Sequence, residues 1–313
     1  MKMVKYKRAL VTGGAGFIGS NLSRALLEKG LDVIIIDNLS MGKIENIPEG
    51  ATFIKGDILD ESILKEIVPS IDIIFHQAAK VSIRESIKEF FDDANNNVMG
   101  TLNLLRSCCN SSVKKFIYAS SMAVYADSES CVPIDENYIK EPISPYGISK
   151  LASEKYCINI AKEIGMDCIV LRYFNTYGKG QTLTPYVGVI TIFINNLLNG
   201  KPPIIFGDGN QKRDFIYVGD VVQANLKAME WNDPTGIFNI GTGETRSVNE
   251  VAGILCKKIN SDIEPVYGEE KQGELKNSVA DLKKTKKELG FYPSAKFEEK
   301  IDEVINWWKN KNI

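Results

Sequence analysis

The sequence lacks several features that would assign it to a specialised class of protein. Its six cysteines form no Cys-x-x-Cys pair, so zinc-site spacing is absent and we expect free thiols and no bound metal. No apolar run approaches the ~20 residues that span a bilayer, and the formal net charge of −2 gives no basic field for nucleic acid. We therefore expect a cytoplasmic protein with neither a membrane nor a nucleic acid as partner.

The composition is that of a globular protein. The chain has 313 residues, of which 44% are hydrophobic and 25% charged, both close to the average for such proteins. This length is enough for one large or two ordinary domains. A disordered tail, a fibrous repeat and a small disulfide scaffold are all excluded.

Short apolar segments alternate with helical patterns in the first half of the chain. The apolar segments are mostly β-branched and near-continuous, as in strands buried on both faces of a parallel sheet. The predicted strands are Ala9–Thr12, Val33–Ile36, Thr52–Ile54, Ile71–Phe75, Phe116–Ala119 and Cys168–Leu171. The predicted helices are Phe17–Lys29, Glu61–Val68, Ser86–Asn110 and Pro145–Ile164. This alternation predicts an α/β fold with a Rossmann-like, doubly wound parallel sheet.

The alternation stops after Arg172, which indicates a second unit. Further helices are predicted at Val189–Leu198, Gly219–Glu230, Val248–Lys258 and Ala295–Lys309, with strands at Ile204–Phe206 and Phe215–Val218. We expect a sheet domain formed by residues 1–174 with a returning segment of about 214–241. Residues 175–213 and 242–313 would form a smaller, mixed α/β C-terminal domain, and ligands would bind in the cleft between the two.

A glycine motif follows the first predicted strand directly and precedes a helix. Gly13, Gly16 and Gly19 have the spacing that permits a tight turn and close approach of the backbone to a pyrophosphate. Asp37 ends the next strand, where a carboxylate accepts hydrogen bonds from the adenosine ribose. Because no arginine follows Asp37, the sequence favours NAD over NADP.

A second pattern points to acid–base chemistry. Tyr146 and Lys150 are four residues apart and share one face of a predicted helix. A Lys150 ammonium beside the phenol would lower the phenol pKa from ~10 by up to ~3 units, towards a working pH of ~7, before the opposing effect of desolvation is subtracted. Ser121 follows a predicted strand, so its hydroxyl would point towards the same cleft. Both patterns also have a purely structural explanation. The Tyr146 and Lys150 spacing is common on surface helices, and Ser121 could be an ordinary polar residue at a strand end.

These motifs together resemble the extended short-chain dehydrogenase/reductase family, and most closely its NAD-dependent nucleotide-sugar epimerases of the UDP-glucose 4-epimerase type. The resemblance extends along the chain through TGGAGFIGS (12–20), IDNLSMG (36–42), SSMAVY (120–125), YGISK (146–150), RYFNTYG (172–178) and FNIGTG (238–243). It implies that residues 1–174 bind NAD. The implied NAD-binding residues are Gly13, Gly16, Phe17, Ile18, Gly19, Asp37, Asn38, Ser40, Gly42, Asp57, Ile58, Gln77, Ala78, Ala79, Asn97, Tyr146, Lys150 and Phe174.

The resemblance also implies the catalytic and substrate-binding residues. Ser121, Tyr146 and Lys150 match the catalytic trio. The implied UDP-sugar contacts are Ser82, Ser121, Tyr146, Asn175, Val189, Phe206, Arg213, Lys271 and Ser278. Lys271 stands where family members usually have arginine. The helices at about 86–110 and 145–164 would pair into a four-helix bundle, so the resemblance implies a homodimer.

The implied reaction is 4-epimerisation of a UDP-hexose through a transient 4-keto sugar, with NAD retained. Met122 and Ala123 replace the acids that related dehydratases and decarboxylases carry after the catalytic hydroxyl. Ser278 replaces a large aromatic residue, which leaves room for the acetamido group of UDP-GlcNAc. The alternatives are a UDP-glucuronate or UDP-pentose 4-epimerase, a UDP-glucuronate decarboxylase, and a dinucleotide-binding regulator without catalysis.

Overall fold

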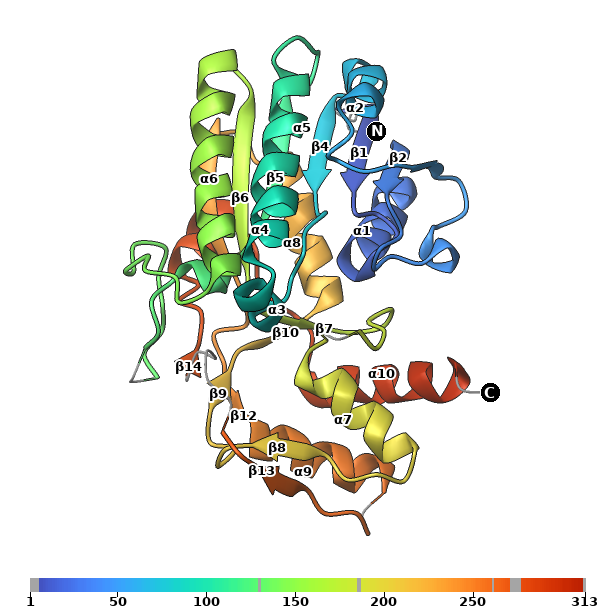
Figure 1. The fold of residues 1–313 in the computed structure, drawn as a ribbon, viewed down its shortest axis with the longest axis vertical. Helices are drawn as coiled ribbons and strands as arrows, with labels where there is room; N and C mark the ends of the chain where they lie inside the picture. Colours follow the sequence, from blue (N-terminus) through green and yellow to red (C-terminus); the bar gives the residue numbers. More distant parts are fainter. Residues whose placement is uncertain (1–5, 129–130, 185–186, 261, 271–276, 312–313) are drawn as a thin grey trace.

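A parallel β-sheet organises the first part of the chain (Figure 1). The computed structural model describes residues 6–128, 131–184, 187–260, 262–270 and 277–311. The seven strands of the sheet are β1 (Arg8–Thr12), β2 (Asp32–Asp37), β3 (Thr52–Lys55), β4 (Ile73–His76), β5 (Lys115–Ser121), β6 (Asp167–Tyr173) and β11 (Thr235–Ile240). Their spatial order is β11-β6-β5-β4-β1-β2-β3, and every neighbouring pair is parallel.

Helices cover both faces of this sheet. The helices of this part are α1 (Phe17–Glu28), α2 (Glu61–Ile67), α3 (Ile83–Lys88), α4 (Phe90–Ala94), α5 (Gly100–Cys108), α6 (Pro145–Ile164) and α8 (Val218–Glu230). One buried cluster joins α1 and α8 to the sheet, and a second joins α2, α5 and α6 to its other face. This arrangement confirms the predicted Rossmann-like, doubly wound fold.

A smaller unit lies beyond the carboxyl ends of the strands (Figure 1). Its helices are α7 (Val189–Leu198), α9 (Val248–Ile259) and α10 (Phe297–Lys311), which share one buried apolar cluster. The remaining short strands are β7 (Asn175–Tyr177), β8 (Ile204–Phe206), β9 (Lys212–Arg213), β10 (Phe215–Tyr217), β12 (Arg246–Ser247), β13 (Val266–Gly268) and β14 (Asn277–Ser278). None of the helices in the described ranges combines the length and apolar character needed to cross a bilayer.

The bounds of α6 follow from local sequence. Ser144 caps its first turn by accepting a hydrogen bond from the Gly147 amide at 3.2 Å, and Pro145 takes the first helical position. Gly165 ends the helix in the left-handed conformation, with φ of 69°. The observed helix therefore has the predicted bounds, Pro145–Ile164.

The single helix predicted over Ser86–Asn110 is wrong. The chain instead forms α3, α4, a π-helical turn at Asn95–Met99 and α5. The first helix begins earlier because the Ser82 hydroxyl caps it, accepting from the Glu85 amide at 3.0 Å. Glu89 then leaves the helical region, with φ of −113° and ψ of 48°, and interrupts the run.

The sequence analysis missed β11 as a strand. Residues 235–240 pair in parallel with β6 from Cys168 to Tyr173 and form the edge of the sheet. The preceding helix α8 packs beside α1 on one sheet face. The domain bounds given above stay a prediction.

Candidate active site

The turn between β1 and α1 is shaped to hold a pyrophosphate. Gly13 has a φ of 68°, and a side chain there would come within 2.8 Å of the Ala78 backbone. A side chain at Gly19 would lie 2.2 Å from the Gly13 carbonyl oxygen. No described side chain caps α1, so the amides of its first turn, which include Phe17 and Ile18, face the loop after β1. The loop fits the diphosphate of a dinucleotide.

A buried carboxylate ends β2 beside this turn. The Asp37 side chain is 8% exposed and accepts hydrogen bonds from the Ala15 amide at 3.0 Å and the Leu39 amide at 2.8 Å. Burial raises its pKa, and these two amides lower it. A side chain at Gly42 would lie 2.8 Å from both carboxylate oxygens, so glycine keeps this position open. The arrangement fits a ribose whose hydroxyls donate to the carboxylate.

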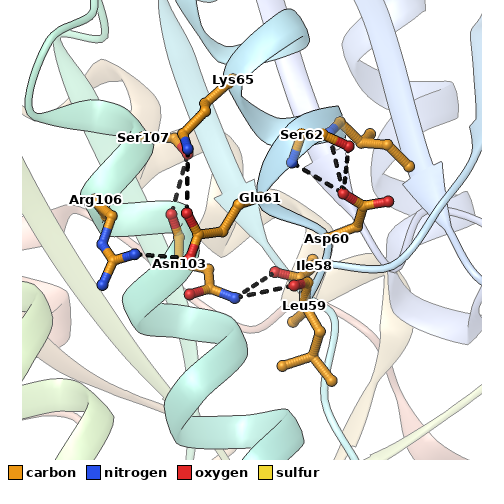
Figure 2. Close-up of polar contacts among 10 residues, drawn as sticks. Ile58, Leu59, Asp60, Glu61, Ser62, Lys65, Asn103, Arg106 and Ser107 are labelled. Carbon is orange, nitrogen blue, oxygen red and sulfur yellow. Dashed lines mark hydrogen bonds and ion pairs between the residues drawn. The ribbon is translucent and has the colours of Figure 1, made fainter.

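The residues expected around the adenine lie at the ends of β2 and β3. Asn38 donates to the Asp57 carboxylate at 2.8 Å, and the Asn38 side-chain oxygen accepts from the Ser40 amide at 2.9 Å. Figure 2 shows Asn103 on α5 donating to the carbonyls of Ile58 and Leu59, at 3.5 and 3.2 Å. The 56–60 turn is thereby fixed to α5, and the Asn38 contact joins Asp57 to the end of β2, next to Asp37.

The end of β4 is held by a chain of hydrogen bonds through the only histidine. His76 contacts the Thr12 hydroxyl at 2.7 Å and the Thr101 hydroxyl at 2.9 Å. The Thr12 oxygen also accepts from the Ala78 amide at 3.1 Å, which positions the Gln77–Ala79 segment. Burial, and then the Lys150 charge, lower the His76 pKa to about 3. The ring is therefore neutral at pH 7 and has a positioning role.

Asn97 lies in the π-helical turn and supports the same groove. Its side chain exchanges two hydrogen bonds with the Lys80 backbone, at 2.8 and 2.9 Å, immediately after Ala79. Gln77 shares hydrogen bonds with Tyr173 and Asn225. Residues 77–80 are thus tied to three helices and β6, as a groove for an extended ligand requires.

The structure brings Ser121, Tyr146 and Lys150 together. Ser121 ends β5, and Tyr146 lies in the first turn of α6, where a hydrogen bond from Ser121 acts on its phenol. The Lys150 ammonium is 6.0 Å from the centre of the Tyr146 ring and donates to the Ala119 carbonyl at 2.8 Å. Tyr146 and Lys150 are 8% and 3% exposed. The three groups meet at the carboxyl end of the sheet.

The expected lowering of the Tyr146 pKa is wrong for this structure. Burial raises the phenol pKa to about 12, and the hydrogen bond from Ser121 only partly opposes this rise. The Lys150 ammonium donates to the Ala119 carbonyl and lies 4.9 Å from the centre of the Tyr118 ring and 6.0 Å from that of the Tyr146 ring. The two side chains are near each other as predicted, but desolvation dominates the pKa of the phenol.

Burial acts on Lys150 in the opposite sense. Desolvation lowers the ammonium pKa to about 8, while negative charge on Asp93 and Glu154 raises it. The group therefore stays mostly protonated at pH 7 but lies close to its titration point. Phe174, expected near the nicotinamide, is buried with Met122 and Leu282.

The expected substrate-binding residues lie mainly on the second unit. Asn175 on β7 donates to the Ser278 hydroxyl at 3.2 Å, and Ser278 is only 1% exposed. Arg213 on β9 pairs with Ser278 on β14 in a three-stranded sheet. Val189 begins α7, Phe206 ends β8, and Ser82 caps α3. Lys271 lies outside the described residues.

Asp214, which the sequence analysis did not identify, fastens this second unit. Its fully buried carboxylate accepts from the Thr242 amide and hydroxyl at 2.8 and 2.7 Å, the Gly243 amide at 2.9 Å and the Ala280 amide at 3.2 Å. These bonds tie β9 to the turn after β11. Asp214 therefore fixes the position of the adjacent Arg213.

A second missed feature is a buried ion pair behind the trio. Arg172 on β6 donates to both oxygens of Glu154 on α6, at 2.9 and 2.7 Å, and both side chains are 1% exposed. The Arg172 guanidinium also donates to the Tyr125 hydroxyl at 2.8 Å. The pair joins α6, which carries Tyr146, to the strand that leads to Asn175.

The carboxyl ends of parallel strands meet at one edge of a sheet, so the glycine turn, Asp37 and the trio lie along the same edge. Among the described residues, no group of three acidic, cysteine or histidine side chains is placed to hold a metal. The fold and the site together define a dinucleotide-dependent enzyme of the short-chain dehydrogenase/reductase type.

Comparison with known proteins gives the family. The profile of the NAD-dependent epimerase/dehydratase family matches residues 9–241, and this chain belongs to that family, with NAD as its cofactor. A structure of UDP-glucose 4-epimerase with UDP-glucose from Thermotoga maritima has 40% identity and a TM-score of 0.94, and covers 98% of this chain and 100% of that one.

Two further relatives support this assignment. The UDP-N-acetylglucosamine 4-epimerase of Methanobrevibacter ruminantium, solved with UDP-N-acetylmuramic acid, has 38% identity and a TM-score of 0.92. That comparison covers 97% of this chain and 99% of the other. The UDP-glucose 4-epimerase of Mycolicibacterium smegmatis is 34% identical over 97% of this chain and 99% of its own.

Proposed function

We propose that the enzyme interconverts the C4 epimers of a UDP-hexose, UDP-glucose and UDP-galactose, and also accepts the corresponding N-acetylhexosamines. The observation that carries the proposal is the meeting of Ser121, Tyr146 and Lys150 at the carboxyl edge of an NAD-binding sheet. Met122 and Ala123, which follow Ser121 directly, are buried apolar residues and offer no acid for dehydration or decarboxylation. Two of the relatives are named as 4-epimerases of UDP-glucose and of UDP-N-acetylglucosamine, which supports a UDP-hexose or UDP-N-acetylhexosamine as the substrate.

The chemistry divides among the trio as follows. Tyr146 takes the proton from the sugar O4 hydroxyl and later returns it, while Ser121 orients O4 by a hydrogen bond. When bound, NAD supplies a reversible hydride acceptor for C4 and a positive charge. Because burial, with a smaller contribution from Asp93, raises the Tyr146 pKa to about 12, the phenolate requires positive charge nearby. We assign that charge to Lys150 together with the bound cofactor. Net oxidation is zero, so no external oxidant is consumed.

The test is turnover by the protein as purified, without added NAD, on UDP-glucose, UDP-galactose, UDP-GlcNAc, UDP-glucuronate and UDP-pentoses. Chromatographic separation of the epimers identifies the products. We expect conversion of the hexoses and the N-acetylhexosamines. Complete inactivity towards UDP-GlcNAc would remove the role given to Ser278, and conversion of only the uronate or a pentose would replace the proposed substrate.

Tyr146→Phe tests the mechanism on the same panel. We expect the variant to retain bound NAD and to lose at least ~100-fold in turnover, the contribution typical of a positioned acid–base group. Tyr292→Phe is the matched control, because Tyr292 is 65% exposed and lies outside the trio and outside α6. Unchanged turnover in Tyr146→Phe would favour a dinucleotide-binding protein whose activity does not use this phenol.

We also propose that the enzyme is a homodimer. The surface of α3, α4, the π-helical turn and α6 carries exposed apolar side chains: Ile87, Phe90, Phe91, Met99, Ile148 and Tyr156. Phe91 is 79% exposed and Phe90 63%. These elements pack against one another, so their outward faces form a surface that a second copy would cover. We refer to these six residues as the helical patch.

A further inference from the structure

Asp93 is a buried carboxylate to which the proposed reaction assigns no role. It lies on α4 and is 2% exposed. One carboxylate oxygen accepts from the Ser149 hydroxyl at 2.6 Å, and the other accepts from the Asn97 side-chain amide at 3.0 Å. Burying a carboxylate costs free energy unless it is hydrogen bonded or balanced by charge, so its position requires an explanation.

The hydrogen bond to Ser149 directs this carboxylate towards the trio. Tyr146, Ser149, Lys150 and Ser153 recur at helical spacing, and all four are buried on the same side of α6. The Ser153 hydroxyl donates to the Asn97 carbonyl at 2.9 Å, which fixes the helix against the turn that holds Asp93. The anion is therefore anchored to the helical face that presents the phenol and the ammonium.

Among the described residues around Lys150, Asp93 is the carboxylate that is not paired with an arginine and can therefore balance the charge of the ammonium. Glu154, on the same helix, is bound at both oxygens by Arg172. His76 from β4 is neutral, and Tyr118 from β5 and Cys157 from α6 are buried groups whose pKa values are raised. Asp93 is the first of the charges that raise the Lys150 pKa, and it also raises the Tyr146 pKa. From the loop after β4, Lys80 faces Asp93 and pairs with the neighbouring Asp92.

We propose that Asp93 is a positioning residue, the buried counter-ion that keeps Lys150 protonated beside Tyr146. The proposal rests on the proposed function, because it concerns the protonation state that this reaction needs. Ser149 holds the carboxylate in place, so the negative charge sits at a fixed position behind the ammonium.

The test is Asp93→Asn in the NAD-bound enzyme, measured as kcat/KM against pH. Asparagine has the same shape, accepts from Asn97 and donates to Ser149, but carries no charge. Loss of the negative charge lowers the pKa of both Tyr146 and Lys150, so we expect both limbs of the profile to move to lower pH. The expected shift is about one unit, the lower end of the range for a nearby charge. Activity at pH 8 then falls more than activity at pH 6.

Asp92→Asn is the matched control, since it neutralises the half-exposed carboxylate next to Asp93 on the same helix. We expect its pH limbs to stay near those of the wild type. A merely structural role of Asp93 would lower kcat in Asp93→Asn while leaving both limbs in place, and that result would overturn the proposal. If the asparagine variant does not fold, Asp93→Ser serves the same comparison.

A readout without turnover separates this proposal from the proposed function. The Lys150 side chain is titrated by the ¹³Cε NMR resonance in wild type and in Asp93→Asn, with Lys150→Arg to assign that resonance. We expect the Lys150 ammonium to titrate at lower pH in Asp93→Asn. If no UDP-sugar is turned over but this shift is present, the function fails and the role of Asp93 stands; no shift in either assay refutes that role.

Discussion

His76 combines full burial with two hydroxyl partners, and the directions of its hydrogen bonds follow from them. The Thr101 hydroxyl donates to the Asn97 carbonyl at 2.6 Å, so it accepts from the Nε2 proton of His76. The Nδ1 atom then accepts from Thr12, whose oxygen accepts from Ala78. A protonated ring would place a second donor against the Thr12 hydroxyl, which agrees with the lowered pKa.

We predict that His76 does not titrate between pH 5 and 8 in the folded protein. Its pKa is about 3 when folded and ~6.5 when unfolded, so the unfolded chain alone binds this proton between those values. Protonation of His76 in the unfolded chain therefore lowers the free energy of unfolding by about 1.4 kcal/mol for each pH unit between 6.5 and about 3. The chain has one histidine, so a single imidazole NMR resonance reports the result, with urea-unfolded protein as the control. A midpoint near 6.5 in the folded state would contradict the prediction.

At the residue scale, the sequence predicts which residues form the site better than it predicts their protonation states. Gly13, Gly19 and Asp37 were found because a dinucleotide turn restricts which residues fit. The predicted direction of the Tyr146 pKa shift was wrong because the shift depends on burial, which helical spacing does not reveal. Asp93 and Asp214 were missed because the sequence alone does not distinguish a buried, hydrogen-bonded aspartate from one exposed to solvent.

Arg172 and Glu154 join two elements, β6 and α6, in the interior of the sheet domain. Ser120 on β5 also donates to the Glu154 carboxylate, so three elements share one buried charge network. Removing one partner would leave the other charge buried and uncompensated. This network fixes the helix that carries Tyr146 relative to the strand that carries Ser121.

We predict that Arg172→Met lowers the free energy of unfolding by about 3–5 kcal/mol, the usual effect of breaking a buried pair. Lys65→Met is the matched control, because Lys65 and its partner Glu61 lie on the surface of α2 (Figure 2). Exposed pairs contribute little, so the control should unfold as the wild type does. Urea unfolding measures both, and equal midpoints for the two variants would refute the prediction.

Some element boundaries were predictable from the local sequence, as for α6, which Ser144 and Gly165 delimit. The predicted bounds of α6, α7 and β8 agree with the structure, and six of the seven sheet strands were placed. The break at Glu89 was missed because residues 86–110 keep a helical pattern on both sides of it. β11 was missed because Gly236 and Asn239 interrupt its apolar run, and its pairing with β6 is not a local property.

At the scale of the whole molecule, the helical patch is an apolar surface that the monomer leaves exposed. We predict that Phe91→Glu converts the dimer to a monomer, since a charge would be buried at the interface. Tyr292→Glu is the matched control, a 65% exposed aromatic residue outside the patch. Light scattering measures both masses. A monomeric wild type, or a dimeric Phe91→Glu, would contradict the proposed interface.

The order of the strands has a consequence for synthesis on the ribosome. β11 and the helix before it are made after the whole of β6, yet they complete its edge and cover one sheet face. A nascent chain that ends before Val218 therefore exposes the unpaired edge of β6 and the apolar surface that α8 later covers. Such intermediates aggregate readily, so the cofactor domain depends on late-emerging sequence for its protection during translation.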